Sequence, residues 1–129
     1  MNNGAVINDA GEQTEQIGQL ADRMLPQVYA LLRRHHIIPN DVQEQMLTSH
    51  VRAMAFRSVT GEPLPEVDAS LFDEISQDAM ALAREVVAAF GNLPEEEAWL
   101  LSVHFEVAKE NLKGAKDGTD YRSDWRPFG

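Results

Sequence analysis

Residues 49–57 read SHVRAMAFR, a helix-forming stretch with a histidine among apolar side chains and an arginine at its end. Residues 93–111 read LPEEEAWLLSVHFEVAKEN and repeat the feature at His104. His50 and His104 are therefore either structural residues of a helical core or members of a working pair. The fold decides between these interpretations, because it determines whether the two stretches meet.

The N-terminal half of the chain predicts two helical segments. Apolar residues recur at three- and four-residue steps from Gln13 to His36, and Pro26 predicts either one kinked helix or two short ones there. Asn40 and Gln43 have the spacing of a capping box, which opens a helix that should end near residue 59. The apolar contacts expected from this second helix are Val42, Met46, Leu47, Met54 and Phe56.

The C-terminal half predicts two more helices. The third should begin at Asp68 or Ser70 and end at Phe90, with Gly91 as its C-cap. Asn92, three residues before Glu95, is expected to cap the last helix, which should end near residue 112. The buried stripe expected on the third helix is Leu71, Ile75, Leu82, Val86 and Phe90.

The two ends of the chain differ from the middle. Residues 1–12 lack helical periodicity and are expected to form a flexible leader, and residues 114–129 form a tail rich in Gly and Asp. The tail carries Tyr121, Trp125 and Phe128, which either belong to a flexible end or fold back onto a groove of this protomer or a neighbour. The expected architecture is all-α, a compact bundle of four to five helices over residues 13–113.

Composition limits the classes of function. A chain of 129 residues favours one domain, and the absence of cysteine excludes disulfides and thiolate sites and fits a cytoplasmic location. No apolar run reaches the length of a membrane span. The formal charge of −10 at pH 7 repels phosphate backbones and anionic lipids, so the expected partners are proteins, with no direct nucleic-acid or membrane binding.

The spacing of the charged residues relates the two histidine stretches. His50 and Arg57 are seven residues apart, as are Glu97 and His104, so each pair lies on one helical face about 10 Å apart along the axis. Antiparallel packing would bring His50 level with His104 and Arg57 level with Glu97. Parallel packing would instead place each histidine beside a charge.

A structural interpretation remains open at this point. A histidine with apolar neighbours is more often a hydrogen-bonded structural residue than a reactive one, and Arg57 with Glu97 can be a simple ion pair. His35 and His36 follow a helix end, where the negative end of the helix dipole stabilises a charged imidazole, and they are expected to be structural. The four histidines do not have the spacing of a metal-binding motif, and no metal or cofactor is expected.

Two motifs carry a family resemblance. Residues 47–65, LTSHVRAMAFRSVTGEPLP, resemble the first signature of the PTS regulation domain (PRD) family, a helical histidine followed seven residues later by an arginine. Residues 93–111 are similar to its second signature, in which a glutamate ending an acidic run precedes a histidine by seven residues. By this resemblance His50 and His104 match the family's phosphorylatable histidines, Arg57 its arginine and Glu97 its acidic residue.

The resemblance, which covers roughly residues 13–112, implies a helical bundle, usually dimeric, phosphorylated by the phosphocarrier protein HPr or by an enzyme II B subunit. The segment before the last helix lacks the family's aromatic-proline break, and no RNA-binding or helix-turn-helix module is found in the sequence. The leading hypothesis is a stand-alone regulatory module that acts in antiterminator-like or related control of carbohydrate genes or metabolism. The alternative is a helical adaptor that is not phosphorylated. No enzymatic motif is found, so an enzyme is not expected.

Overall fold

The computed structural model describes residues 2–117, and the side chains of residues 11–111, as a bundle of helices. No strand is found among residues 2–117, which confirms the expected all-α fold. The elements are α1 (Asn2–Arg34), α2 (Asp41–Thr60), the short 3-10 helix η1 (Ala69–Phe72), α3 (Gln77–Phe90) and α4 (Glu95–Asp117).

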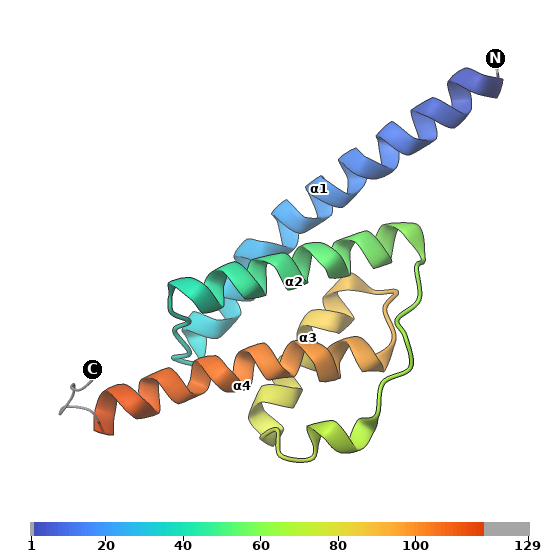
Figure 1. Ribbon diagram of the computed structural model, residues 1–129. Coiled ribbons are helices and arrows are strands. Elements are labelled where there is room, and N and C mark those ends of the chain that lie inside the picture. The colour runs from blue at the N-terminus through green and yellow to red at the C-terminus, as the bar shows by residue number, and fades with distance from the viewer. Residues whose placement is uncertain (1, 118–129) are drawn as a thin grey trace.

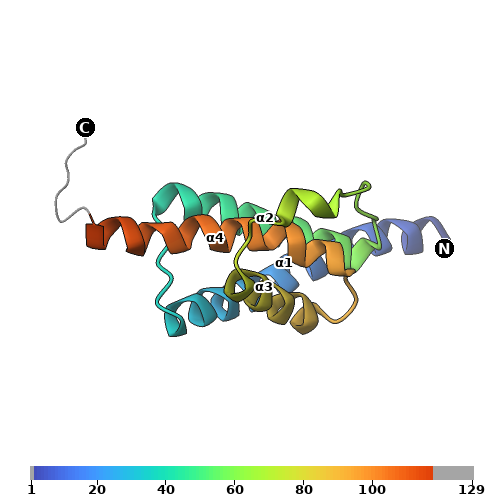
Figure 2. The ribbon, with the colours of Figure 1, turned by 90° about the horizontal axis from the view of Figure 1, so that it is seen from below.

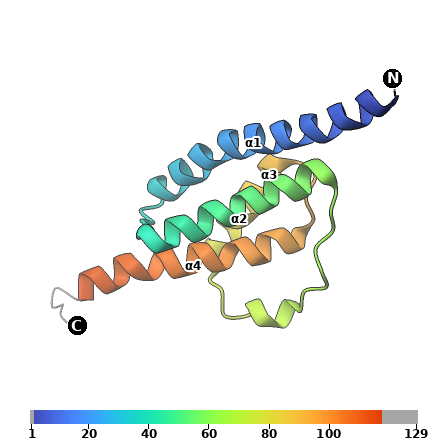
Figure 3. The same ribbon diagram turned by 45° about the horizontal axis from the view of Figure 1, so that its top comes forward.

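The helices form two layers. α2 and α4 lie side by side and run antiparallel in the front layer (Figure 1). Behind them lie α3 and the C-terminal half of α1 (Figure 2). α3 packs mainly on α4, and α1 packs mainly on α2, whereas α1 and α3 have little contact with each other. Turned forward, α1, α2 and α4 follow one another across the molecule (Figure 3).

Apolar side chains from all four α-helices fill the space between the layers. Phe105 and Leu101 of α4 and Met54 of α2 are completely buried, and burial of a side chain of this size contributes about 1.5–3 kcal/mol. The remaining core residues are mainly small or β-branched, which suits the close approach of four helices. They include Val28, Leu31, Leu32, Leu47, Val51, Ala79, Leu82, Ala83, Val86, Ala98 and Ala108.

α1 decides between the two alternatives at Pro26 and begins earlier than expected. It is a single helix through Pro26, whose neighbours Met24 and Val28 are both buried while Pro26 itself is exposed. The hydrogen bond lost to proline therefore lies on the solvent side, and packing holds the helix together. The helix also begins at Asn2, so residues 2–12, which lack helical periodicity in the sequence, are helical and extend beyond the bundle (Figure 1).

α2 begins and ends as the sequence indicates. The Asn40 side chain accepts from the Gln43 amide, and the Gln43 side chain accepts from the Asn40 amide, which confirms the capping box. Three expected apolar contacts of this helix are nevertheless exposed at the surface. Their exposed fractions are 64% for Val42, 56% for Met46 and 45% for Phe56.

The third helix is shorter than expected. Asp68 caps only η1, and α3 begins at Gln77 after Ser76, whose hydroxyl accepts from the Ala79 amide. Ser76 also donates to the Glu106 carboxylate on α4 at 2.8 Å, so the start of α3 is fixed by a tertiary contact that the sequence pattern does not reveal. Leu71 consequently lies outside the core and is 73% exposed. Gly91 ends α3 with a φ of 93°, as expected for a glycine C-cap.

α4 differs from its expected limits at both ends. It begins at Glu95, and the Asn92 side chain, expected to cap it, instead bonds to Ser58 on α2 at 2.7 and 2.9 Å. It continues to Asp117, past Gly114 and past the expected end near residue 112. The three tail aromatics lie outside the described residues. None of the described helices is long and apolar enough to cross a membrane.

A matched pair of leucine truncations tests the position of the core. Leu101→Ala should lower the free energy of unfolding by about 2–5 kcal/mol, because Leu101 is completely buried. Leu71→Ala should change it by less than about 0.5 kcal/mol, because Leu71 is largely exposed. Urea unfolding of both variants measures the difference. Equal losses would contradict the exposed position of η1.

Candidate functional site

The antiparallel packing of α2 and α4 brings the two histidines together. The ring centroids of His50 and His104 are 4.8 Å apart, and the ring planes are tilted by 41°. Two turns away, Arg57 lies opposite Glu97, as the antiparallel alternative predicted. The four residues selected from the sequence therefore form one row of contacts between two distant segments.

Arg57 and Glu97 form a two-pronged ion pair. The Arg57 Nε donates to Glu97 Oε2 at 2.6 Å, and Nη2 donates to Oε1 at 2.8 Å. The Glu97 side chain is only 1% exposed and that of Arg57 is 15% exposed. A buried carboxylate needs such a partner, because an unpaired charge is strongly disfavoured away from water.

The row has a third pair of residues that the sequence argument missed. Gln43 of α2 and Asn111 of α4 exchange hydrogen bonds through their side-chain amides, and Asn111 also donates to the Ile38 carbonyl. Gln43 precedes His50 by seven residues, and Asn111 follows His104 by seven. One further seven-residue step from each histidine, away from Arg57 and Glu97, leads to Gln43 and Asn111. The sequence spacing could therefore have identified this pair.

Both imidazoles are held in their neutral form. Burial lowers the pKa of His50 from its ordinary value of 6.5 to about 4, with smaller contributions from the nearby charges of His104 and Arg57. Burial also lowers the pKa of His104. At neutral pH each ring therefore keeps a lone pair on one nitrogen, which is the nucleophilic form.

The two rings differ in access. Nε2 of His50 is buried and has no hydrogen-bond partner, and among the described residues no other buried side-chain nitrogen or oxygen is in this position. His50 and His104 nevertheless line a shallow groove of about 510 Å³, together with Gln45, Met46 and Ser49. Of the two, His104 has no buried, unpartnered nitrogen and is the more accessible ring.

Exposed apolar side chains lie on both helices that form this groove. Met46 and Phe56 of α2 and Val103 and Val107 of α4 are all between 40% and 56% exposed. The sequence misassigned Met46 and Phe56 to the core because apolar residues occur around more than one side of α2. Such a helix is typically covered on more than one face, so the pattern was a signal for a second contact surface.

The other two histidines lie elsewhere. His35 and His36 are exposed at the end of α1, where His36 has a φ of 61° and so occupies the left-handed region typical of a helix end. No group of three or more metal-ligating side chains is found in the part of the chain that the structure describes. The candidate site therefore consists of the row between α2 and α4.

Comparison with known proteins places this arrangement in a family. No protein-family model and no curated protein matches the chain. Among solved structures it is similar to a PRD-containing transcription regulator from Lactobacillus casei, at 37% identity, covering 78% of this chain and 94% of that chain, with a TM-score of 0.70. The fold and its two histidine motifs define a helical regulatory module. The chain belongs to the PRD family, as the two sequence motifs predicted.

Truncating Arg57 should be far more costly than truncating an exposed arginine. Arg57→Met leaves the Glu97 carboxylate buried without a partner, and we expect it to lower the free energy of unfolding by about 3–5 kcal/mol. The double variant Arg57→Met, Glu97→Leu should recover most of this loss. Arg84→Met is the control, because the Arg84 and Glu95 side chains are 56% and 49% exposed and their pair contributes about 0–1 kcal/mol. A loss no larger than that of the control would contradict the buried pair.

The lowered pKa of His50 makes stability depend on pH. Because this pKa is lower in the folded protein than in the unfolded chain, the unfolded chain binds more protons between pH 6.5 and about 4. Stability should therefore be complete above pH 6.5 and decrease as the pH falls toward 4, and His50→Gln should reduce this dependence. Nitrogen-detected NMR should show the His50 ring neutral until about pH 4. Titration of that ring near pH 6.5 would contradict its burial beside His104 and Arg57.

Proposed function

We propose that this chain is a regulatory module whose His50 or His104 is phosphorylated by proteins of the phosphotransferase system, and which signals through protein contacts. The observation that carries the proposal is the pair of neutral imidazoles at a surface groove, with ring centroids 4.8 Å apart. Control of carbohydrate-related genes or metabolism is the setting that membership of the PRD family favours.

The transfer requires only a nucleophilic nitrogen and an accessible ring. A lone pair of the acceptor imidazole attacks the phosphorus of a phosphohistidine on HPr or an enzyme II B subunit. The new P–N bond forms as the bond to the donor ring breaks, and the donor ring takes up the proton that the acceptor ring releases. His104 is the first acceptor that we expect, because Nε2 of His50 is buried.

The added phosphate needs a compensating cation, because it brings about two negative charges to a protein that already carries −10. Arg57 affects the pKa of His50, so its charge acts at this site. Its Nε and Nη2 bond to Glu97, which leaves the donors of Nη1 for a phosphoryl oxygen. We infer that Arg57 stabilises the phosphate while Glu97 holds its guanidinium in position.

The apolar surface beside the histidines fits the contact through which the signal passes. Met46 lines the groove, and Phe56, Val103 and Val107 are exposed on the same two helices, so we expect a second copy of the chain that covers them to cover the histidines as well. A phosphate placed within such a homodimer would change its packing by repulsion or by a new arginine contact. Phosphorylation would thereby change how strongly two copies of the chain associate.

Phosphotransfer in vitro tests the proposal. Incubation with phosphoenolpyruvate, enzyme I and HPr, with and without an enzyme II B subunit, should add one or two phosphoryl groups that are stable in alkali and labile in acid. His104→Gln should remove most of the label and His50→Gln the remainder. His35→Gln is the control, because that histidine is exposed but lies outside the groove. Sedimentation of the labelled and unlabelled protein reports the change in association.

The second candidate function is a helical adaptor whose histidines are structural. The unpartnered, buried Nε2 of His50 and the exposed apolar residues around the groove favour it, since a partner could cover this surface without any phosphate. Under that function phosphodonors leave the protein unlabelled, while His50→Gln alters stability or partner binding. Label that persists in the double variant His50→Gln, His104→Gln would contradict both candidates.

A further inference from the structure

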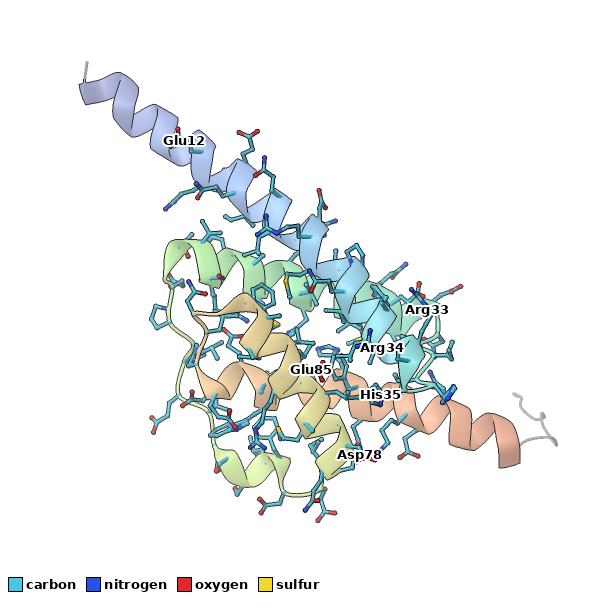
Figure 4. The ribbon with its side chains drawn as sticks, turned by 180° about the vertical axis from the view of Figure 1, so that it is seen from behind. Glu12, Arg33, Arg34, His35, Asp78 and Glu85 are labelled. Atoms are coloured by element: carbon cyan, nitrogen blue, oxygen red, sulfur yellow. The ribbon has the colours of Figure 1, made fainter. Side chains whose placement is uncertain are left out.

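The back of the molecule carries a groove that the histidine site does not use. It lies where α1 and α3 separate, and its volume is about 220 Å³. Met24, Val28, Leu31 and Val86 form an apolar lining that belongs to the core. Seen from behind, α1 and α3 form this face of the molecule (Figure 4).

The rest of the groove lining makes room for large side chains. Ala30 of α1 and Ala89 of α3 are small, and Gln27 is the one neutral polar residue among the lining. Arg34 and Glu85 contribute opposite charges from the two helices. An apolar lining beside small residues and two charges fits an aromatic segment that also carries charges.

A second hollow continues the groove toward α4. It has a volume of about 350 Å³ and shares Glu85 with the first. Asp78 and Lys109 give it opposite charges, His35 also lines it, and Lys109 belongs to α4. Figure 4 shows His35, Asp78 and Glu85 around this part of the back face. The two hollows therefore form one path from α4 to the apolar groove between α1 and α3.

The chain beyond α4 starts close to this path. α4 ends at Asp117, eight residues or about 12 Å after Lys109, at the same end of the bundle as the turn from α1 to α2 (Figure 1). Residues 118–129 follow, and twelve residues span up to about 40 Å when extended. This segment can turn back at Gly118 and reach both hollows.

The segment and the path both carry charges of both signs. Residues 118–129 read GTDYRSDWRPFG, with acidic residues at 120 and 124, basic residues at 122 and 126, and aromatic residues at 121, 125 and 128. The second hollow presents Lys109 and Asp78, the apolar groove presents Arg34, and Glu85 lines both. A chain laid along it finds charges of both signs to pair with its own and carries its aromatic rings toward the apolar lining.

We propose that the groove between α1 and α3 binds this chain's own C-terminal segment, residues 118–129, with Trp125 against the apolar lining. The bound segment would fill the space between α1 and α3, beneath which Met24, Val28, Leu31 and Val86 are buried core residues. It lies on the face opposite the paired histidines, so both faces can be occupied at once. This proposal does not depend on phosphorylation.

Fluorescence of a single tryptophan in the full chain tests the proposal. Trp99→Phe leaves Trp125 as the only tryptophan and keeps a ring next to Phe72. The Trp125 emission should be shifted to the blue, and its acrylamide quenching constant should be several-fold lower in the native protein than in urea. Ala89→Arg, which fills the groove, should return both values to those of an exposed indole.

The matched control is Ala88→Arg, because Ala88 is also exposed on α3 but does not line the groove. It should leave the Trp125 signal unchanged. Native quenching equal to that in urea, or equal effects of the two arginine variants, would overturn the proposal. Protection that disappears on dilution would also overturn it, since the groove would then hold the tail of a second copy.

Discussion

The buried pair of Arg57 and Glu97 is the constraint on which the candidate site depends. Apolar contacts alone fix the alignment of two antiparallel helices only weakly, because the hydrophobic effect has no direction. A carboxylate that is only 1% exposed prevents such a slide, since any other alignment would leave its charge without the guanidinium. The pair therefore selects the one alignment in which His50 faces His104, and the amides of Gln43 and Asn111 hold the other end.

This alignment also sets the chemistry of the rings. Burial lowers the pKa values of both imidazoles, and the nearby charges of His104 and Arg57 lower that of His50 further. Both shifts favour the neutral form of the rings at neutral pH. The cost is one buried nitrogen without a partner, a loss that the surrounding core residues must offset. A buried nitrogen that lowers stability in this way fits a site whose role is chemistry or binding.

The sequence predicted those features that depend on spacing along one helix. The seven-residue steps identified both histidines and both charges, and Asn40 and Gly91 identified helix ends correctly. The features that depend on contacts between helices could not be predicted in the same way. Ser76 begins α3 because Glu106 holds it, and Leu71 lost its expected place in the core as a result. Phe56 is exposed because α2 packs mainly on α1 and α4, which leaves part of its surface uncovered, a fact that no single-helix pattern contains.

α4 carries residues of both faces of the molecule. His104 contacts His50 at the front, and Lys109, five residues later, lines the hollow at the back. Because a helix moves as a rigid rod, a small displacement along its axis alters both places together. Thermodynamic linkage then makes the effect mutual. If binding at the back groove shifts α4 and changes the affinity of the histidine groove for its partner, binding of that partner changes the affinity of the back groove by the same factor.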